Sequence, residues 1–189
     1  MLSVSRSGEP LPWYTYPCIE FLKFRNYANK TILEFGAGQS TMWWAQRASR
    51  VISLEADKLW LQKLQLEVPS NVDLYLIPDS DSSSCVNAVN AILSKSSIAK
   101  FDVVIIDGVW RWHMIEIASQ VVTEDGMIIC DNAEGYGFCE GFRHRGFRRV
   151  DFFGNAPGVV LQHCTSIFFG CSSFAFDPSH PIPDIGKNG

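Results

Sequence analysis

The sequence lacks an excess of basic residues. Its 189 residues include 16 Lys and Arg against 20 Asp and Glu, which gives a net charge of −4. Proteins that bind a nucleic-acid duplex usually carry a basic surface that neutralises phosphates, so we expect no nucleic-acid partner. One short basic cluster, which we interpret as a solvated helix end and strand start, comprises Arg143, His144, Arg145, Arg148 and Arg149.

Long apolar runs are also missing. No uninterrupted stretch approaches the roughly 20 residues that span a bilayer, and residues 1–12 contain no apolar core of a secretory signal. The six cysteines form no Cys-x-x-Cys pair, and Cys130 and Cys164 lie in apolar, strand-like runs. We therefore predict a cytoplasmic protein without membrane contact, with reduced thiols and no zinc site.

Short β-branched runs alternate with helical patterns along the chain, which indicates a parallel sheet covered by helices on both faces. The predicted strands are residues 31–35, 51–54, 72–77, 101–106, 127–130, 147–153 and 166–170. The predicted helices are residues 39–48, a helix from the cap Asp57 to 67, one ending near 93, then 111–122 and 136–145.

The last two predicted strands are joined by residues 154–163, a loop too short for a helical crossover, so we expect an antiparallel pair. The fold class is thus α/β, a Rossmann-like three-layer sandwich with a seven-stranded, mostly parallel sheet and a C-terminal antiparallel hairpin. A nicotinamide-binding domain would normally continue with further parallel units. We predict one domain over residues 1–171, opened by an N-terminal segment 1–30, and a loose tail over 172–189.

The first predicted strand runs into the glycine turn Gly36-Ala37-Gly38. Glycines let the backbone approach a ligand closely, and the following helix offers free N–H groups at its start. The third glycine of a dinucleotide fingerprint is absent, because Thr41 takes its place. Glu34, two residues before the turn, suits a ligand with a cationic amine better than one with a phosphate.

Glu55 ends the second predicted strand, 17 residues after Gly38. A carboxylate at this place can accept hydrogen bonds from both hydroxyls of a ribose. Because neighbouring strands of a parallel sheet end side by side, Glu55 and the glycine turn should converge on one ligand. Taken alone, Glu55 could equally be an exposed helix cap.

Residues 31–131 resemble the class I S-adenosylmethionine-dependent methyltransferases. Residues 34–38 are similar to the family's first motif, Glu55 to its ribose-binding acid, and residues 101–107 to its fourth motif. Residues 126–129 resemble the start of its fifth strand, although Asp125 replaces a glycine. The resemblance implies S-adenosylmethionine as cofactor, with Asp79 or one of its neighbours Ser80 and Asp81 near the adenine. The implied cofactor-binding residues are Glu34, Gly36, Gly38, Ser40, Glu55, Asp79 and Asp107.

Asp107, Asp131 and Asn132 follow the ends of two predicted strands and are similar to the metal ligands of catechol-type O-methyltransferases. Three hard oxygen ligands would suit Mg²⁺, which would lower the pKa of an acceptor hydroxyl. No lysine follows Asp107 where that group carries its base, since residues 110–112 are Trp-Arg-Trp. Alternatively, Asp131 and Asn132 form a turn that caps the next helix.

Methyl transfer depends on alignment, and it needs a base only when the acceptor is a hydroxyl or an amine. His113, six residues after Asp107, is the nearest candidate, and we name both as candidate catalytic residues. The aromatic segment 12–17, together with Trp110 and Trp112, would border an acceptor pocket. Its other interpretation is packing of an N-terminal helix against the sheet.

The sequence therefore predicts a methyltransferase that acts on an oxygen or nitrogen of a small molecule. The alternatives are a Mg²⁺-dependent O-methyltransferase and, from another class, a non-catalytic cofactor-binding module that works in a complex. Because the sequence shows no inserted acceptor domain, the acceptor pocket must come from the N-terminal segment and the strand-end loops, or from a partner subunit in a homo-oligomer.

Overall fold

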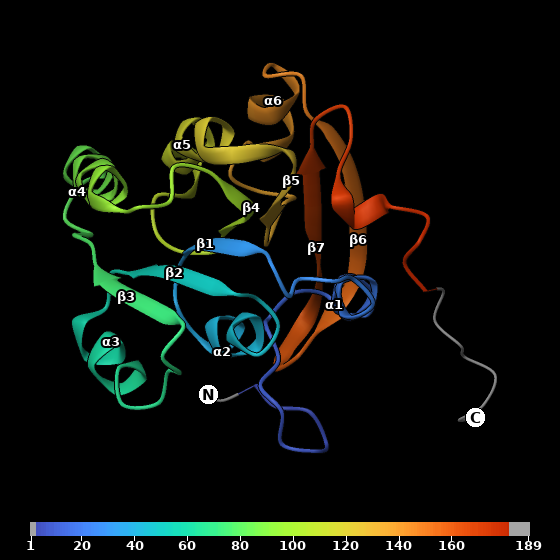
Figure 1. The fold of residues 1–189 in the computed structure, drawn as a ribbon, viewed down its shortest axis with the longest axis horizontal. Helices are drawn as coiled ribbons and strands as arrows, with labels where there is room; N and C mark the ends of the chain where they lie inside the picture. The colour runs from blue at the N-terminus through green and yellow to red at the C-terminus, as the bar shows by residue number, and fades with distance from the viewer. Residues whose placement is uncertain (1–2, 182–189) are drawn as a thin grey trace.

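The computed structural model describes residues 3–181. The strands of this part of the chain are β1 (Thr31–Phe35), β2 (Arg50–Glu55), β3 (Val72–Leu76), β4 (Phe101–Ile106), β5 (Val122–Cys130), β6 (Arg148–Ala156) and β7 (Val159–Phe169). They form one seven-stranded sheet in the order β3-β2-β1-β4-β5-β7-β6 (Figure 1). The strands β1 to β5 pair in parallel, whereas β7 is antiparallel to both β5 and β6. The predicted sheet, with its closing antiparallel hairpin, is confirmed.

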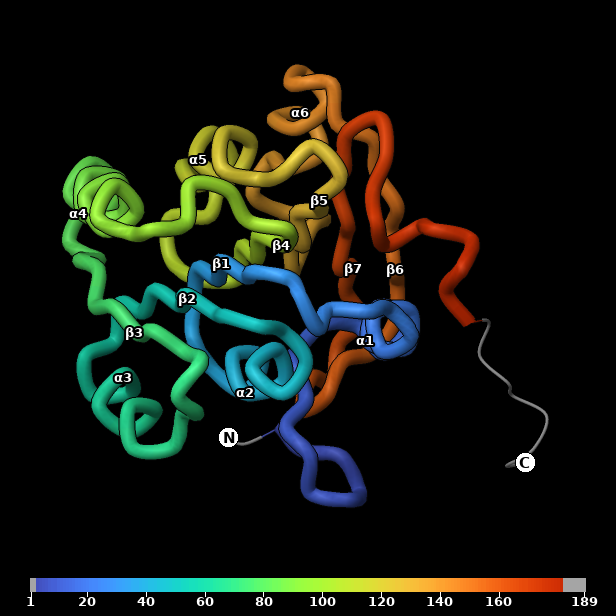
Figure 2. The backbone as a smooth tube through the Cα atoms, viewed as in Figure 1, coloured from blue at the N-terminus to red at the C-terminus, as the bar shows by residue number. Residues whose placement is uncertain are grey.

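Helices cover both faces of this sheet. They are α1 (Tyr16–Lys23), α2 (Gln39–Ala45), α3 (Lys58–Leu64), α4 (Ser82–Lys95), α5 (Met114–Val121) and α6 (Phe138–Arg143), with short 3₁₀ turns η1 (Arg111–His113) and η2 (Phe174–Phe176). The tube in Figure 2 shows α2 and α3 below the sheet and α4, α5 and α6 above it, and the buried residues of α1 pack in the same hydrophobic core as those of α2. The three predicted layers are therefore present.

The sheet has a hydrophobic core on each face, and successive side chains of a buried strand point alternately into one core and the other. In β1, Ile32 packs with the helices α1 and α2, whereas its neighbours Leu33 and Phe35 pack with α4, α5 and α6. In β4, Val103 and Val104 divide between the two cores in the same way. Strands buried on both faces consist almost entirely of apolar residues, so these strands could be predicted from apolar runs in the sequence.

The hairpin β6–β7 is longer than predicted. Residues 154–163 do not form a loop, because only Pro157 and Gly158 separate the two strands, and Gly158 adopts a φ of +74°. Strand β7 begins at Val159 rather than at residue 166, so His163 lies within it. Strand β5 likewise begins at Val122 rather than at 127, with a shift of register against β4 where a turn was predicted.

The helices are mostly shorter than predicted, and the chain stays packed beyond residue 171. The predicted helix 111–122 opens as the 3₁₀ turn η1. The expected loose tail instead begins with η2, in which Ala175 is fully buried and Phe176 packs against Phe21 and Phe169. Aromatic side chains at both ends of η2 explain this packing, and the rest of the predicted tail, residues 182–189, lies outside the described residues.

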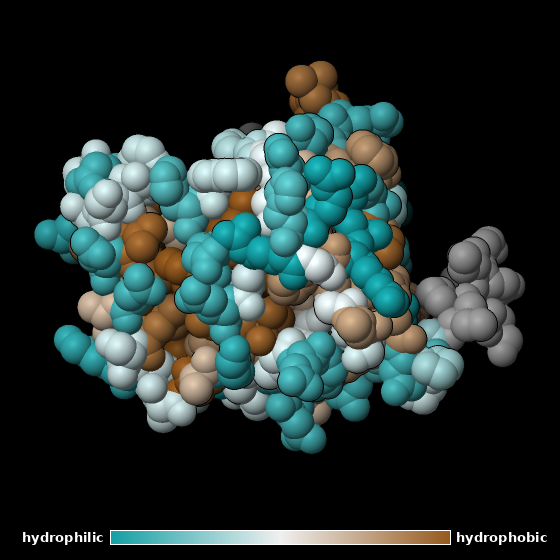
Figure 3. Space-filling view, turned by 90° about the horizontal axis from the view of Figure 1, so that it is seen from above, coloured by the Kyte–Doolittle hydropathy of each residue, from teal (hydrophilic) through white to brown (hydrophobic). Residues whose placement is uncertain are grey.

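The surface of the molecule is mainly polar on the face shown in Figure 3. Polar side chains predominate on the face drawn in Figure 3, with apolar ones showing between them. None of the helices within residues 3–181 is long and apolar enough to cross a membrane.

Candidate functional site

A cavity of about 560 Å³ opens at the carboxyl ends of β1, β2, β4 and β5. Its wall includes Gly36 and Gly38 after β1, Glu55 at the end of β2, Asp107 after β4, and Asp131 after β5. Ligands of open parallel sheets bind at this edge, and small-molecule sites commonly have volumes of about 300–1,000 Å³. The topology therefore brings most of the predicted site residues to one cavity.

Gly36 sits where no side chain fits. Its φ is +99°, and a Cβ atom would lie 2.8 Å from the carbonyl carbon and oxygen of Asp107. The Asp107 N–H donates to the carbonyl of Phe35 at 2.9 Å, so the turns after β1 and β4 are in direct contact. Glycine at this position is thus a requirement of the fold itself.

Gly38 has a different reason to be glycine. Its φ of −175° is ordinary extended backbone, and a Cβ atom there would meet no heavy atom of the described residues within 4 Å. Gly38 and the neighbouring Ser40 both line the cavity. The turn therefore leaves room for a ligand to approach the main chain.

Glu55 is anchored by the main chain around this turn. Its Oε2 atom accepts a hydrogen bond from the Ala37 N–H at 3.0 Å, and its Oε1 atom accepts from the N–H groups of Ala56 and Asp57, both at 2.7 Å. Trp60 donates its Nε1–H to the Ala37 carbonyl at 2.8 Å. The carboxylate and the turn are thus held as one unit, with Glu55 and Trp60 in the cavity wall.

Glu34 lies beneath the turn rather than in the cavity wall. Its Oε2 atom accepts hydrogen bonds from the hydroxyls of Thr41 and Ser53 at 2.5 and 2.6 Å, and Thr41 in turn accepts from the Gly38 N–H at 2.9 Å. Thr41, in the place of the third glycine, therefore connects Glu34 to the turn. Burial raises the pKa of Glu34 to about 7, against the effect of these hydroxyls.

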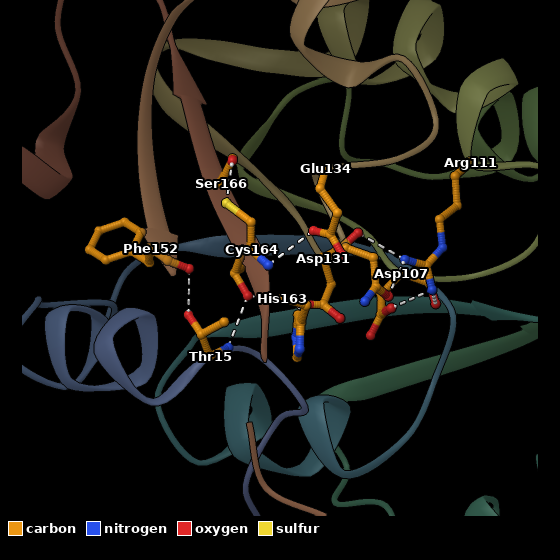
Figure 4. Close-up of polar contacts among 11 residues, drawn as sticks. Thr15, Asp107, Arg111, Asp131, Glu134, Phe152, His163, Cys164 and Ser166 are labelled. Atoms are coloured by element: carbon orange, nitrogen blue, oxygen red, sulfur yellow. Dashed lines mark hydrogen bonds and ion pairs between the residues drawn. The ribbon is translucent and has the colours of Figure 1, made fainter. Parts of the chain in front are cut away.

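The Arg111 guanidinium joins the ends of β4 and β5. Its Nη2 donates to Asp107 Oδ1 at 2.8 Å and to the Asp107 carbonyl at 3.1 Å, and its Nε donates to the Gly108 carbonyl at 3.0 Å. Its Nη1 donates to the Asp131 carbonyl at 2.8 Å and to Asn132 Oδ1 at 3.1 Å (Figure 4). All five N–H groups of the guanidinium are thereby used.

This arrangement does not support the predicted magnesium site at Asp107, Asp131 and Asn132. The oxygens expected to bind the metal, Oδ1 of Asp107 and Oδ1 of Asn132, instead accept hydrogen bonds from a permanent organic cation. Within residues 3–181 no group of three or more His, Cys, Asp or Glu side chains is arranged to hold a metal ion. The residues present therefore do not fit Mg²⁺ as first expected.

Burial dominates the electrostatics at this end of the cavity. It raises the pKa of Asp107 to about 8, with repulsion from Asp131 adding to the shift and attraction to Arg111 opposing it. Burial also raises the pKa of Asp131 above its ordinary value, against a hydrogen bond from Thr165 and the proximity of His163. Two neighbouring carboxyls that resist ionisation favour a positively charged ligand.

Asp131 is tied to the N-terminal segment through Thr165. Its Oδ1 atom accepts from the Thr165 hydroxyl at 2.7 Å, and that hydroxyl oxygen accepts from the Thr15 N–H at 2.9 Å (Figure 4). His163, also on β7, lines the cavity with its Nε2 atom 3.3 Å from Asp131 Oδ1. The segment before α1 thus reaches the site, as Trp13 in the cavity wall also shows.

Three predicted site residues do not line the cavity, and one of them, Glu34, lies beneath the glycine turn. Asp79 is exposed after β3, and His113 is exposed on η1 beside Trp110; neither lines the cavity. Trp110 and Trp112 are also exposed and outside the lining. Both interpretations of the aromatic segment hold in part, because Trp13 borders the cavity whereas Tyr14 is buried in the core.

Sequence reasoning missed the contributions of Arg111 and His163. Arg111 stands where the related enzymes carry a lysine, and an arginine four residues after a strand-end aspartate can pair with that aspartate. His163 was placed in a loop, although Pro157-Gly158 is a two-residue turn signal that would have extended the following strand through it. Each had a recognisable local signal.

No protein-family model and no curated protein matches this sequence. Among solved structures, the chain is similar to precorrin-6y C5,15-methyltransferase from Geobacter metallireducens GS-15, with 14% identity, a TM-score of 0.61, and coverage of 82% of this chain and 87% of that one. A methyltransferase-like protein from Silicibacter pomeroyi DSS-3 aligns with 17% identity and a TM-score of 0.58 over 93% and 92% of the two chains. This chain has the fold of the class I methyltransferases.

The same fold occurs in a protein described as precorrin 8w decarboxylase, from Methanobacterium thermoautotrophicum. It is 15% identical, with a TM-score of 0.58 and coverage of 88% of this chain and 95% of that one. The class I methyltransferase fold therefore does not by itself fix the reaction, which has to be argued from the cavity.

Proposed function

We propose that the protein is an S-adenosylmethionine-dependent methyltransferase that acts on an oxygen or nitrogen of a small molecule. The observation that carries this proposal is the pairing of the open space at Gly38 with the anchored carboxylate of Glu55 in one cavity. A glycine turn beside a fixed acid suits a ligand that has a backbone-contacting end and a ribose.

The geometry around Glu55 favours a ribose hydroxyl as its partner. A carboxylate has about four acceptor positions, and main-chain N–H groups take one on Oε2 and two on Oε1. The remaining position, on Oε2, suits a hydroxyl donor. The amino-acid end of the cofactor would then lie along the turn from Gly36 to Gly38, above Glu34.

The charges in the cavity also favour this cofactor. Glu55, Asp107 and Asp131 line it, and the one positive charge of Arg111 is taken up by five hydrogen bonds to oxygens. S-adenosylmethionine carries a sulfonium and supplies an electrophilic methyl group. An acidic wall attracts such a cation more than it attracts a pyrophosphate, which disfavours a nicotinamide dinucleotide.

The basic cluster near the end of α6 supports a small-molecule acceptor rather than a nucleic acid. Arg145 pairs with Glu116, Arg149 pairs with Asp151 at 3.0 Å, and the Arg148 guanidinium donates to the Cys171 carbonyl at 3.3 Å. Side chains engaged in this way offer little net positive charge to a phosphate backbone.

Calorimetric titration with S-adenosylhomocysteine tests the proposed cofactor. We expect micromolar binding to the wild type and binding at least about tenfold weaker to Glu55→Ala, because the variant loses the ribose partner and the anchor of the turn. Glu67→Ala, a change to an exposed glutamate on the same βα unit, is the matched control and should bind as the wild type does.

Two results would contradict the proposal. The first is no binding to a folded wild type at millimolar ligand. The second is equal binding to the Glu55→Ala and wild-type proteins, which would place the ligand elsewhere. Formation of S-adenosylhomocysteine from S-adenosylmethionine in the presence of phenols or amines then separates an enzyme from a non-catalytic module, and its insensitivity to EDTA separates it from the Mg²⁺-dependent alternative.

A further inference from the structure

His163 is a buried histidine without a complete hydrogen bond. Its side chain is 6% exposed, yet the residue lines the cavity. Neither Nδ1 nor Nε2 has a hydrogen-bond partner among the described residues, since Nε2 approaches Asp131 Oδ1 to 3.3 Å without aligning with it. A buried polar atom left unpaired destabilises the folded protein, so a group of this kind in a cavity wall is a candidate partner for a bound ligand.

Asp131 is fixed in the position where it can orient this ring. Its Oδ1 atom accepts from Thr165, whose hydroxyl oxygen accepts from the main-chain N–H of Thr15. The Thr15 hydroxyl donates to the Phe152 carbonyl at 2.9 Å, which joins the segment before α1 to β6 as well. Figure 4 shows this series of contacts running from Phe152 to Asp131, with His163 beside the aspartate. Three elements thus hold one carboxylate against one imidazole.

We propose that His163 is the general base that accepts the proton of the methyl acceptor, with Asp131 as the residue that positions it. The proposal rests on the methyltransferase function proposed above. Because Nε2 faces Asp131, the proposal assigns the acceptor's proton to Nδ1, which has no hydrogen-bond partner among the described residues. Carboxylate–imidazole pairs serve as bases in this way because the carboxylate stabilises the imidazolium that forms.

The proton and electron balance of the step is complete without a further reactant. The acceptor X–H bond breaks, its proton goes to His163 Nδ1, and its electron pair forms the bond from X to the methyl carbon. The carbon–sulfur bond breaks with its electrons passing to sulfur, which leaves a neutral thioether. The imidazolium then returns its proton to water. This assignment selects acceptors that carry a hydroxyl or an amine proton.

The carboxylates near the cavity already accept hydrogen bonds, and the other candidate histidine lies outside it. The Asp107 carboxylate is bound by Arg111, and the Glu55 carboxylate is bound by three main-chain N–H groups. His113, the histidine favoured by the sequence, is exposed and outside the cavity. The cavity wall also contains Trp13 and Val159, an indole and an aliphatic side chain that suit a flat acceptor.

A chromophoric phenol measures this role directly. We would titrate 4-nitrophenol into the complex with S-adenosylhomocysteine, about one pH unit below the pKa of the free probe. In the wild type the bound probe should show the phenolate absorbance, at least about fivefold more ionised than the free probe, because its proton passes to His163. In His163→Gln the probe should bind with similar affinity and keep the spectrum of the neutral phenol.

Two further variants separate positioning from folding. Asp131→Asn and Thr165→Val should each lower the ionised fraction of the bound probe, because the imidazolium loses its counter-ion or the carboxylate loses its anchor. His144→Gln, at a histidine whose side chain is 64% exposed, is the matched control and should behave as the wild type does. Circular dichroism and binding of S-adenosylhomocysteine verify that each variant is folded.

The outcomes distinguish this proposal from the one on which it rests. If S-adenosylhomocysteine does not bind, the methyltransferase proposal fails and the base role fails with it. If it binds but the complex does not bind 4-nitrophenol, or ionises it equally in the wild type and His163→Gln, only the base role is overturned. A phenolate signal lost in His163→Gln and retained in His144→Gln supports it.

Discussion

The Arg111 guanidinium lies against Asp107, with Nη2 2.8 Å from Oδ1, four residues further along the chain. The same guanidinium also reaches the Asp131 carbonyl and Asn132 Oδ1 beyond the neighbouring strand. The chain therefore carries its own cation at the place where the sequence suggested a metal ion. Because that cation is covalently part of the fold, the ends of β4 and β5 are joined without a ligand.

Replacing Arg111 by lysine should destabilise the protein. Lysine keeps the charge but offers three donors in place of five and lacks the planar fork. We expect the free energy of unfolding in urea to fall by about 1–2 kcal/mol, since half-buried oxygens of Asp107 and Asn132 lose partners. Arg143→Lys, at an exposed arginine, should change it by less than about 0.5 kcal/mol. Equal stability of the two variants would show that the Arg111 contacts contribute little.

The two glycines of the turn should respond oppositely to alanine. Gly36→Ala forces a Cβ to within 2.8 Å of Asp107 main-chain atoms at a φ of +99°, so we expect a loss of at least about 2 kcal/mol in the free energy of unfolding. Gly38→Ala places its Cβ in open space and should leave the unfolding midpoint nearly unchanged.

Gly38→Ala, which should leave stability nearly unchanged, should instead weaken ligand binding. The Gly38→Ala methyl group would occupy space that the ligand needs, so we expect its affinity for S-adenosylhomocysteine to fall about tenfold or more by calorimetry. Undiminished affinity in Gly38→Ala would mean that the ligand does not approach the main chain at this turn.

Glu34 should make stability depend on pH. Burial raises its pKa from 4.5 to about 7, so the native protein keeps a proton that the unfolded chain releases between those values. The contribution of protonated Glu34 to the free energy of unfolding is therefore complete below about pH 4.5 and is lost as the pH rises through 7. Relative to Glu34→Gln, the wild type should lose on the order of 3 kcal/mol between pH 4.5 and pH 8. Urea unfolding across this range measures the difference, and parallel curves for the two proteins would contradict the buried placement of Glu34.

The proposed cofactor should bind with a pH dependence that its product lacks. Burial raises the pKa of Asp107 to about 8, and a bound sulfonium favours its ionised form. We expect the affinity for S-adenosylmethionine, relative to S-adenosylhomocysteine, to rise by up to about tenfold from pH 6.5 to pH 9. Calorimetry in two buffers of different ionisation enthalpy should detect proton release on binding the cation. A constant ratio across this range would show that Asp107 does not sense the sulfonium.

Residues whose position follows from local pattern could be predicted from the sequence. The apolar strand containing Leu33 ends at the Gly36 turn, and parallel neighbours end at one edge, so Gly36, Glu55 and Asp107 were expected at one cavity and line it. Periodicity and strand order are sufficient for such predictions. Asp79 was assigned by resemblance alone, without a pattern to position it, and lies exposed outside the lining.

Residues that act through tertiary contacts could not be predicted in the same way. The pairing of His163 with Asp131 depends on the register of β7 against β5, in which Ser166 lies opposite Cys130. That register sets which side chains face the cavity. It could not be predicted from a hairpin whose loop was assigned too long, because loop length fixes the register. Arg111 required knowledge that two strand ends would present oxygens within reach of one guanidinium.

A crystal structure of the protein grown with saturating S-adenosylhomocysteine tests the central claim most directly. We expect the ligand in the cavity at the strand ends, with a ribose hydroxyl on Glu55 Oε2, the amino-acid end along Gly36 to Gly38, and the sulfur toward the end of the cavity that contains Asp131. A ligand bound elsewhere, or a cavity without ligand density under these conditions, would contradict the assignment of this site to a methyl donor.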